Sequence, residues 1–325
     1  MDELSPSDLK TILHSKRANI YYLEHCRVLV NGGRVEYVTD QGKRQLYWNI
    51  PIANTTTILL GIGTSITQAA MRELAKAGVL VGFCGGGGTP LFSANELDVD
   101  VAWFSPQSEY RPTEYLQAWV RFWFEDEARL RAAKAFQKAR LAWIERQWLG
   151  QRVLQEYGFV LDADKLRALL AASASMVDVA ADTTSLLTEE ARLTKELFKL
   201  AARTLKYGDF VRAKRGTGTD PANRFLDHGN YLAYGLGATA AWVLGLPHGL
   251  AVLHGKTRRG GLVFDIADLA KDALILPQAF ISAVRGDYEQ EFRRACIENL
   301  TRAEALDHMI DTVKRVAIDT ARSAA

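Results

Sequence analysis

Alternating apolar and polar positions mark the first quarter of the chain and predict short β-strands. The strand-like runs lie at residues 19–23, 27–30, 34–38, 46–50 and 57–60. In the third run, Arg34 and Glu36 alternate with apolar partners. Asn31-Gly32-Gly33 separates the second run from the third, and Asn-Gly between alternating runs is a strong hairpin signal. We therefore expect a hairpin around this tripeptide.

The hydrophobic period changes at residues 66–77, where the spacing predicts a helix. Thr64 or Ser65 can cap its first turn, and Gly78 can end it. Residues 79–83 then return to a strand pattern. Because one hairpin-linked strand pair does not persist alone, these strands require a shared core. The first domain is therefore predicted to be β-rich with a helix.

Two prolines and several polar residues at 100–112 interrupt the pattern and predict a domain boundary. We place a β-rich domain at residues 1–105 and an all-helical domain at 106–325. Helical spacing begins with Tyr115, Trp119, Phe122 and Trp123 and continues to residue 149. Further helices are expected at residues 164–180, 187–207, 224–244 and 264–285, with one or two more at the C-terminus. The tryptophans at helical spacing are interpreted as core or interface residues.

Composition is that of an ordinary globular protein. The chain has 325 residues, of which 48% are hydrophobic and 24% charged, and its net charge is +2. This charge is too small to indicate a polyanionic partner, so local clustering must decide. Three widely spaced cysteines without a CxxC motif argue against a disulfide framework or a zinc site and favour a reducing cytoplasm. The N-terminus shows no signal peptide pattern, and no apolar run is long enough to predict a membrane span.

Glu190 is the first candidate for chemistry. At ~100° per residue, helical phase places it with Leu193 and Leu197 on the apolar face of its predicted helix. Glu189 falls about a quarter turn away, near the edge of that face. A structural alternative makes Thr188 the N-cap and both glutamates first-turn acids. However, a carboxylate directed into a core is costly unless it is paired or bound to a metal.

His254, Asp265 and Asp268 form a second group of candidates. His254 ends the apolar run 250–253, where a lone histidine is more often a hydrogen-bonded structural residue. Asp265 and Asp268 stand three apart at a predicted helix start, so they share a face and repel unless a cation lies between them. Asp265 could also be an ordinary helix-start acid. Carboxylates with one imidazole and no thiolate suit Mg²⁺ or Mn²⁺ rather than zinc.

Basic residues flank these candidates on both sides. Residues 192–224 contain nine Lys or Arg against three acids, and three more cations follow His254 directly. A solvated helix face is the usual explanation of such charges, but their position beside carboxylates suits contact with a phosphate backbone. The candidate DNA contacts are Lys195, Lys199, Arg203, Arg212, Lys214, Arg215, Arg224, Lys256, Arg258 and Arg259.

Two glycine-rich segments are interpreted as turns. Residues 85–88 are four glycines after a predicted strand, but no Gly-Lys-Ser or Gly-Lys-Thr follows, so they do not form a P-loop. Gly61-Ile62-Gly63 lacks the third glycine of a dinucleotide-binding fingerprint. Neither segment therefore predicts a nucleotide site.

A set of segments, taken in order, resembles the CRISPR-associated endonuclease/integrase family Cas-one. The amino-acid sequence of many of these segments is close to that of the subtype I-F branch. The segments are residues 61–70, the helix with Glu190, Asp220-Pro221-Ala222-Asn223, residues 249–254 and residues 262–268. The resemblance implies a β-sandwich-like N-terminal domain and an all-helical catalytic domain. It also implies that Glu190, His254 and Asp268 are metal ligands and that Asp265 is a supporting acid. Many family members carry Glu where Asp268 stands.

The resemblance further implies an enzyme that inserts captured DNA into a CRISPR repeat array. A Mg²⁺- or Mn²⁺-dependent site would let a 3′-hydroxyl attack a repeat strand by transesterification. Implied partners are double-stranded DNA, repeat DNA, a second copy bound through the N-terminal domain, and the second CRISPR-associated protein fused to the Cas-three helicase-nuclease. Two alternatives stay open: a branched-DNA repair nuclease with the same site, and a noncatalytic DNA-binding scaffold.

Overall fold

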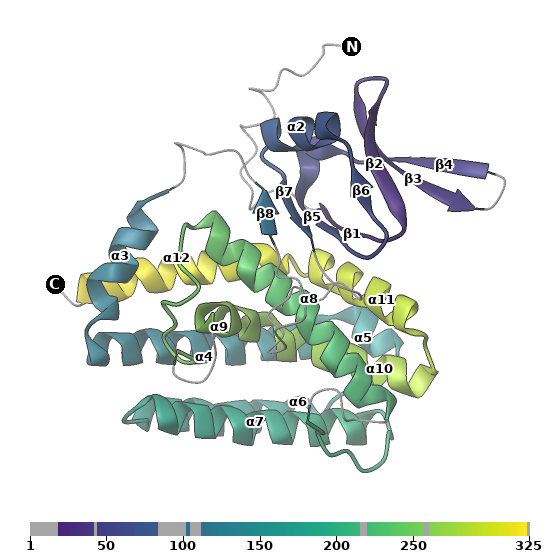
Figure 1. Cartoon of the computed structure of the whole chain (residues 1–325). Coiled ribbons are helices and arrows are strands. Elements are labelled where there is room, and N and C mark those ends of the chain that lie inside the picture. Colours follow the sequence, from purple (N-terminus) through teal and green to yellow (C-terminus); the bar gives the residue numbers. More distant parts are fainter. Residues whose placement is uncertain are drawn as a thin grey trace. The chain divides into compact units, whose positions relative to one another are not determined.

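The computed structural model describes residues 19–41, 44–83, 102–104, 112–214, 220–255 and 260–323 (Figure 1). The chain divides into two compact units, Met1–Arg111 and Pro112–Ala325. The first is strand-rich and the second is helical, which confirms the predicted α+β class with a small N-terminal and a larger all-α part. Within the described ranges, no helix combines the length and the apolar character needed to cross a membrane.

The first unit contains two four-stranded sheets. One has the order β1 (Asn19–Leu23), β5 (Thr55–Leu60), β7 (Leu80–Phe83), β8 (Ala102–Phe104). The other has the order β4 (Arg44–Asn49), β3 (Arg34–Gln41), β2 (Cys26–Asn31), β6 (Ser65–Ile66). Strands β1, β5 and β7 run parallel, whereas β2, β3 and β4 form an antiparallel meander. A 3-10 turn, η2 (Ile52–Asn54), precedes β5.

The β2–β3 hairpin confirms the turn predicted from the glycine pair. Asn31 lies opposite Arg34, so only Gly32 and Gly33 form the loop. Their φ angles are 55° and 78°, values that residues with a side chain rarely adopt. Two positive φ angles give a turn whose twist matches that of the flanking strands.

Helix α2 (Gln68–Lys76) starts later than predicted, because neither Thr64 nor Ser65 caps it. Thr67 is the N-cap, and its hydroxyl accepts a bond from Ala70 N at 3.2 Å. The preceding residues instead pair with β2 as strand β6. Gly78 follows the helix with φ 69°, as predicted for a helix end.

Buried side chains from both sheets and from α2 form one apolar core in the first unit. The core residues are Leu23, Cys26, Val28, Val35, Ile50, Ile58, Leu60, Ala70, Leu74, Ala77, Val79 and Val81. The shared core that the strands were predicted to require is therefore present.

The second unit is built from helices of very different burial. They are α3 (Glu114–Trp123), α4 (Asp126–Gly150), α5 (Arg152–Glu156), α6 (Ala163–Val179), α7 (Thr183–Thr204), α8 (Pro221–Val243), α9 (Gly261–Ala270), α10 (Leu276–Arg285), α11 (Glu289–Arg302) and α12 (Ala305–Ser323). A π-helical turn, η4 (Lys271–Ile275), joins α9 to α10. Helix α9 packs against α4, α8 and α12, and all ten of its residues are buried. An apolar helix at the centre of a bundle needs partners for its two aspartates.

Helix α7 begins earlier than the predicted residue 187. Asp182 caps it, accepting a bond from Ser185 N at 2.7 Å. Thr188 is therefore not the N-cap; its hydroxyl donates to the carbonyl of Thr184, one turn back. The two glutamates that follow lie about two turns inside the helix, so capping does not explain them.

Three tryptophans of the second unit, Trp119, Trp143 and Trp148, are core residues, as predicted. Trp119 and Trp148 are almost fully buried, and Trp143 is buried in a stack on His308 with ring centroids 3.6 Å apart. This stack joins α4 to α12. The rings are therefore not available as base-stacking platforms.

Candidate metal centre

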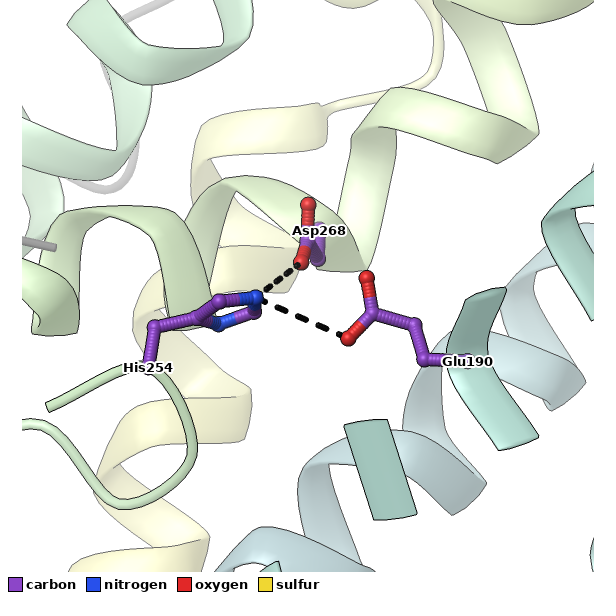
Figure 2. Close-up of side chains that lie close together, drawn as sticks. All are labelled: Glu190, His254 and Asp268. Atoms are coloured by element: carbon purple, nitrogen blue, oxygen red, sulfur yellow. Dashed lines mark ion pairs between the residues drawn. The ribbon is translucent and has the colours of Figure 1, made fainter. Parts of the chain in front are cut away.

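Three side chains from separate segments meet in the second unit (Figure 2). Glu190 comes from α7, His254 from the loop between α8 and α9, and Asp268 from α9. His254 Nε2 lies 3.6 Å from Glu190 Oε2 and 3.9 Å from Asp268 Oδ2. One ligand atom from each residue lies within 4.8 Å of the others, close enough to share one cation. Structure and sequence thus select the same three residues.

The loop that carries His254 is held by two indoles from α3. Trp119 Nε1 donates to the carbonyl of Leu250 at 2.9 Å, and Trp123 Nε1 donates to the carbonyl of Ala251 at 2.8 Å. A loop buried this deeply needs such partners for its backbone. The two tryptophans therefore position the segment that ends at His254.

Asp265 fixes the same loop from the other side. One carboxylate oxygen accepts from Val252 N at 2.7 Å and Leu253 N at 3.2 Å, and the other accepts from His254 N at 3.0 Å. His254 Nδ1 lies 2.8 Å from that second oxygen, so a proton on Nδ1 would allow Nε2 to bind a cation through its lone pair. A Cβ on Gly261 would lie 2.9 Å from the His254 carbonyl, so the close approach requires glycine there.

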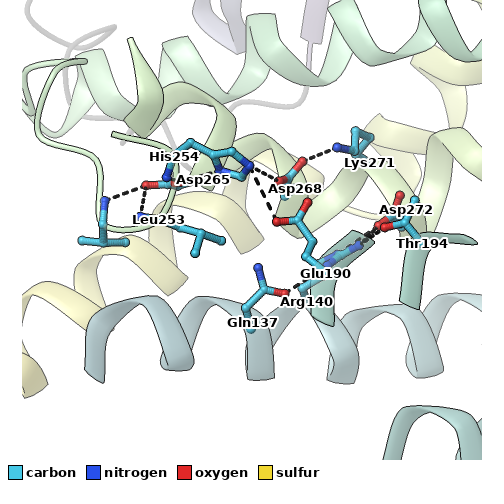
Figure 3. A network of polar contacts seen from close by, with 11 residues as sticks. Gln137, Arg140, Glu190, Thr194, Leu253, His254, Asp265, Asp268, Lys271 and Asp272 are labelled. Atoms are coloured by element: carbon cyan, nitrogen blue, oxygen red, sulfur yellow. Dashed lines mark hydrogen bonds and ion pairs between the residues drawn. The ribbon is translucent and has the colours of Figure 1, made fainter. Parts of the chain in front are cut away.

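Asp268 and Asp265 have different partners, although they lie three residues apart. Asp265 turns to the His254 loop, and Asp268 accepts a bond from Lys271 through Oδ1 (Figure 3). Asp268 Oδ2 is the oxygen nearer to His254. Asp265 is also in the second turn of α9, not at its start, so the helix-start interpretation was wrong. It supports the cluster without belonging to it.

Burial and neighbouring charges shift the protonation of the cluster. Burial, together with the charge of Asp268, raises the pKa of Glu190. Burial alone would lower the pKa of His254, but the bond to Asp265 and the charges of the other two acids raise it overall. Burial alone would raise the pKa of Asp268, yet Lys271 and His254 lower it to about 2. The cluster thus attracts positive charge, and a metal ion would compete with protons for it.

The donor set fits a hard divalent cation. Glu190 Oε2 is buried and has no hydrogen-bond partner within the described part of the chain. An unsatisfied buried carboxylate oxygen is costly, and a cation beside it would remove that cost. Two carboxylates and one imidazole, without a thiolate, are ligands that suit Mg²⁺ or Mn²⁺. These residues therefore fit the ion that the sequence predicted.

Sequence reasoning missed a second layer of polar residues behind the cluster (Figure 3). It comprises Gln137, Arg140, Thr194, Lys271 and Asp272. The sequence could have predicted that Arg140 points inward, because it stands four residues after Phe136 and four before Ile144, on the buried face of α4. Lys271 follows Asp268 by one helical turn, which also could have indicated a pair.

Glu189 is more buried than its predicted position at the edge of the apolar face suggested. Its side chain is 5% exposed, and it accepts bonds from Arg192 on α7 and from Ser173 on α6. These partners lower its pKa against the opposing effect of burial. Glu189 therefore ties α6 to α7, while Glu190 faces the cluster.

The predicted DNA contacts differ in their surroundings. Lys195, Arg203, Lys214 and Arg224 are exposed, and Lys199 pairs with Glu196. Arg212 is only partly exposed, and it donates to Asp227 and to Asn223 Oδ1, so it anchors its own segment. Arg215, Lys256, Arg258 and Arg259 lie outside the described residues, as do glycines 85–88.

Fold and cluster together define a class: a two-unit protein whose helical unit carries a buried acid–histidine centre. A family model described as CRISPR associated protein Cas1 matches residues 21–293. The CRISPR-associated endonuclease Cas1 of Pseudomonas aeruginosa is 73% identical over 317 residues, covering 98% of each chain. The chain therefore belongs to the Cas1 family of CRISPR-associated endonucleases, the family that its sequence resembles.

Solved structures share the fold at low sequence identity. A TtCas1–DNA complex has a TM-score of 0.61 and 22% identity, covering 92% of this chain and 91% of its own. A casposase bound to an integration product has a TM-score of 0.67 and 14% identity, covering 94% and 91%. The strand-rich unit followed by a helical unit is therefore an arrangement that these proteins have in common.

Proposed function

We propose that this protein is a Mg²⁺- or Mn²⁺-dependent DNA endonuclease and integrase that inserts captured DNA fragments into a CRISPR repeat array. The observation that carries the proposal is the convergence of Glu190, His254 and Asp268 around one buried carboxylate oxygen that has no hydrogen-bond partner among the described residues. Membership of the Cas1 family supports the nuclease activity. The structural likeness to a casposase bound to an integration product supports strand transfer.

Glu190, His254 and Asp268 would hold the metal ion. When bound there, a divalent ion polarises the scissile phosphate and stabilises negative charge on the attacking or leaving oxygen. The nucleophile in integration would be the 3′-hydroxyl of the captured fragment, which attacks a phosphodiester of the repeat and releases a 3′-hydroxyl from it. Water in the same role would give nicking.

The surrounding residues orient the three ligands. Asp265 keeps the proton of His254 on Nδ1, so that Nε2 faces the two acids. Lys271 holds Oδ1 of Asp268 and directs Oδ2 toward the imidazole. Its buried ammonium also balances part of the negative charge of the cluster. These contacts pre-form the site, so less reorganisation is needed when substrate binds.

DNA would be held through its phosphates. Lys195 and Arg203 are exposed on the helix that carries Glu190, and Lys214 and Arg224 are exposed on the segments that follow. Such contacts bind DNA without reading bases, so sequence preference would come from the partner and from DNA shape. The solved TtCas1–DNA complex, which shares the fold, supports a DNA partner.

The assembly proposed for this reaction has two further protein components. A second copy would bind through the strand-rich unit, and the second CRISPR-associated protein, fused to the Cas-three helicase-nuclease, would complete the complex. The reaction would take place in the cytoplasm, the reducing compartment that the three widely spaced cysteines favour. These partners follow from the family resemblance.

Strand transfer of a labelled duplex into a supercoiled repeat-containing plasmid tests the proposal. Reactions would contain Mg²⁺, Mn²⁺ or EDTA, with and without the partner. Wild type would be compared with His254→Ala and Asp268→Ala, and with Glu145→Ala as a control at an exposed acid of α4. We expect metal-dependent joining in wild type and control, and loss of joining in both site variants.

The outcomes separate the alternatives. Joining that survives in both site variants would contradict the ligand assignment. Cleavage of branched junctions without partner or repeat DNA would favour a repair nuclease. Tight DNA binding with no joining in the complete complex, and no effect of the site variants, would favour a noncatalytic scaffold.

A further inference from the structure

Arg140 lies in the middle of α4 and is the most deeply buried cation of the site region, with a side chain 1% exposed. Among the described residues, it makes no hydrogen bond with Glu190, His254 or Asp268. All of its hydrogen bonds go to Gln137, Thr194 and Asp272 (Figure 3). A buried guanidinium with three separate partners needs an explanation beyond stability, because apolar residues of similar size often serve stability as well.

One hydrogen bond of Arg140 links it to α7, the helix that carries Glu190. Arg140 Nη2 donates to Thr194 Oγ1 at 2.7 Å. Thr194 follows Glu190 by four residues on α7, so the two side chains lie one above the other on the same helix face. A bond to Thr194 therefore restrains the position and rotation, relative to α4, of the turn of α7 that contains Glu190.

A second contact links Arg140 to Asp272, in the segment that follows Asp268. Arg140 Nε donates to Asp272 Oδ2 at 2.9 Å, and Nη2 donates to the same oxygen. From the same helix, Trp148 Nε1 donates to the carbonyl of Asp272 at 3.0 Å. Both the side chain and the backbone of Asp272 are thus fixed by α4.

Asp272 lies in the π-helical turn that ends α9. In a regular helix, adjacent side chains point about 100° apart. Lys271 and Asp272 could therefore not both point directly at partners in the interior. The wider π turn accompanies an arrangement in which Lys271 pairs with Asp268 while Asp272 pairs with Arg140. π turns inside helices are frequent at functional sites.

Electrostatics point the same way. The positive charge of Arg140 acts to lower the pKa of both Glu190 and Asp268, against the effect of burial. Arg140 is hydrogen-bonded to both Thr194 and Asp272, so the restraint is direct.

We propose that Arg140 is a positioning residue that links the two ligand-bearing helices, setting the separation of Glu190 and Asp268 through Thr194 and Asp272. This inference rests on the proposed metal-dependent function. Arg140 would act through Thr194 and Asp272, because its hydrogen bonds go to these residues and to Gln137. Its role is to hold two carboxylates from different helices at the spacing that one divalent cation needs.

Two variants test the link. Thr194→Val removes only the bond to α7 and keeps the shape of the side chain. Arg140→Gln combined with Asp272→Asn replaces the ion pair by a neutral polar pair, so no buried charge is left alone. The control is Arg167→Gln, which breaks an exposed pair between α6 and α4.

The readouts separate positioning from folding and from DNA binding. Mn²⁺ binding to the full chain without DNA is measured by electron paramagnetic resonance, with thermal unfolding beside it. DNA binding is measured in EDTA, and strand transfer is measured across a Mn²⁺ titration. We expect the double variant to bind Mn²⁺ about ten- to hundredfold more weakly, with unchanged DNA binding and with transfer recovering at high Mn²⁺. Thr194→Val should show a smaller shift in the same direction.

Four results would overturn the inference. Mn²⁺ binding like that of wild type in both folded variants would remove the positioning role while leaving the proposed function intact. Loss of transfer that high Mn²⁺ does not restore would assign Arg140 a different task. If the double variant does not fold, Thr194→Val decides alone, and an unchanged Mn²⁺ affinity there counts against the link. Absence of Mn²⁺ binding in wild type would refute the inference together with the proposed function.

Discussion

Changing Asp265 to Asn should destabilise the helical unit and loosen the loop that carries His254. Asp265 is buried, with a side chain 1% exposed, and its two oxygens accept four hydrogen bonds from three consecutive loop residues. Asn has the same shape but only one acceptor oxygen. The NH₂ group of Asn would stand where a carboxylate oxygen accepts two hydrogen bonds. It is a donor, so it cannot accept from the two N–H groups there.

The size of the loss follows from this count. The Asn oxygen can keep one pair of bonds, so the other pair is lost. A hydrogen bond to a charged acceptor contributes about 1.5–3 kcal/mol, so the free energy of unfolding should fall by about 3–6 kcal/mol. Because domains are stable by only about 5–15 kcal/mol in total, a change of this size is easily measured.

Urea unfolding at pH 7, followed by the fluorescence of the buried tryptophans of the second unit, measures the loss. Asp162→Asn is the matched control: the same chemical change at the exposed N-cap of α6, where Asn caps as well as Asp. We also expect weaker Mn²⁺ binding from Asp265→Asn, because the imidazole loses its orienting partner. An unfolding free energy equal to that of the control variant would refute the anchoring role of Asp265.

Three further outcomes are expected. Burial and two nearby arginines lower the pKa of His308 to about 4, below its ordinary 6.5, so the unfolded chain binds the proton more readily. Stability is therefore complete above pH 6.5 and should fall by about 1–2 kcal/mol toward pH 4, allowing for partial exposure; acid-dependent urea curves of His308→Phe should lack this fall. Gly237→Ala would place a Cβ 2.7 Å from the carbonyl oxygen of Val263 and should cost about 1–3 kcal/mol in urea unfolding, whereas Gly150→Ala, with open space around it, should cost nothing; equal effects would contradict the tight α8–α9 contact. Mn²⁺ at about one hundred times its dissociation constant should raise the unfolding free energy by about 2.7 kcal/mol, reversibly with EDTA, and Glu190→Gln should lose most of this gain; a full gain in that variant would exclude Glu190 as a ligand.

Local rules were reliable where a few neighbouring residues decide the outcome. Gly32 and Gly33 define the hairpin because only a two-residue turn with positive φ angles joins strands with the observed twist. Helical phase directed Glu190 inward because the period of 3.6 residues depends only on the helix itself. The same rule was less reliable at helix ends, where Thr67 and Asp182 supplied caps at positions other than those expected.

The partners of the inward residues lay beyond local rules. The phase of α4 directs Arg140 to the interior, but its partner Asp272 is 132 residues away along the chain. In the same way, two acids three residues apart, Asp265 and Asp268, were expected to share one cation. Their different partners depend on where the His254 loop and the π turn pass.

From the order of residues alone, one could obtain the two-unit class, the buried phase of Glu190 and the donor types suited to a hard cation, because each depends on short-range periodicity or on side-chain chemistry. The family resemblance separated the three cluster residues from the supporting acid Asp265, but only the packed structure showed the contacts behind that difference. It also brought Arg140, Thr194 and Asp272 together. Contacts across helices depend on how three segments from distant parts of the chain meet, and no spacing along a single helix encodes that meeting.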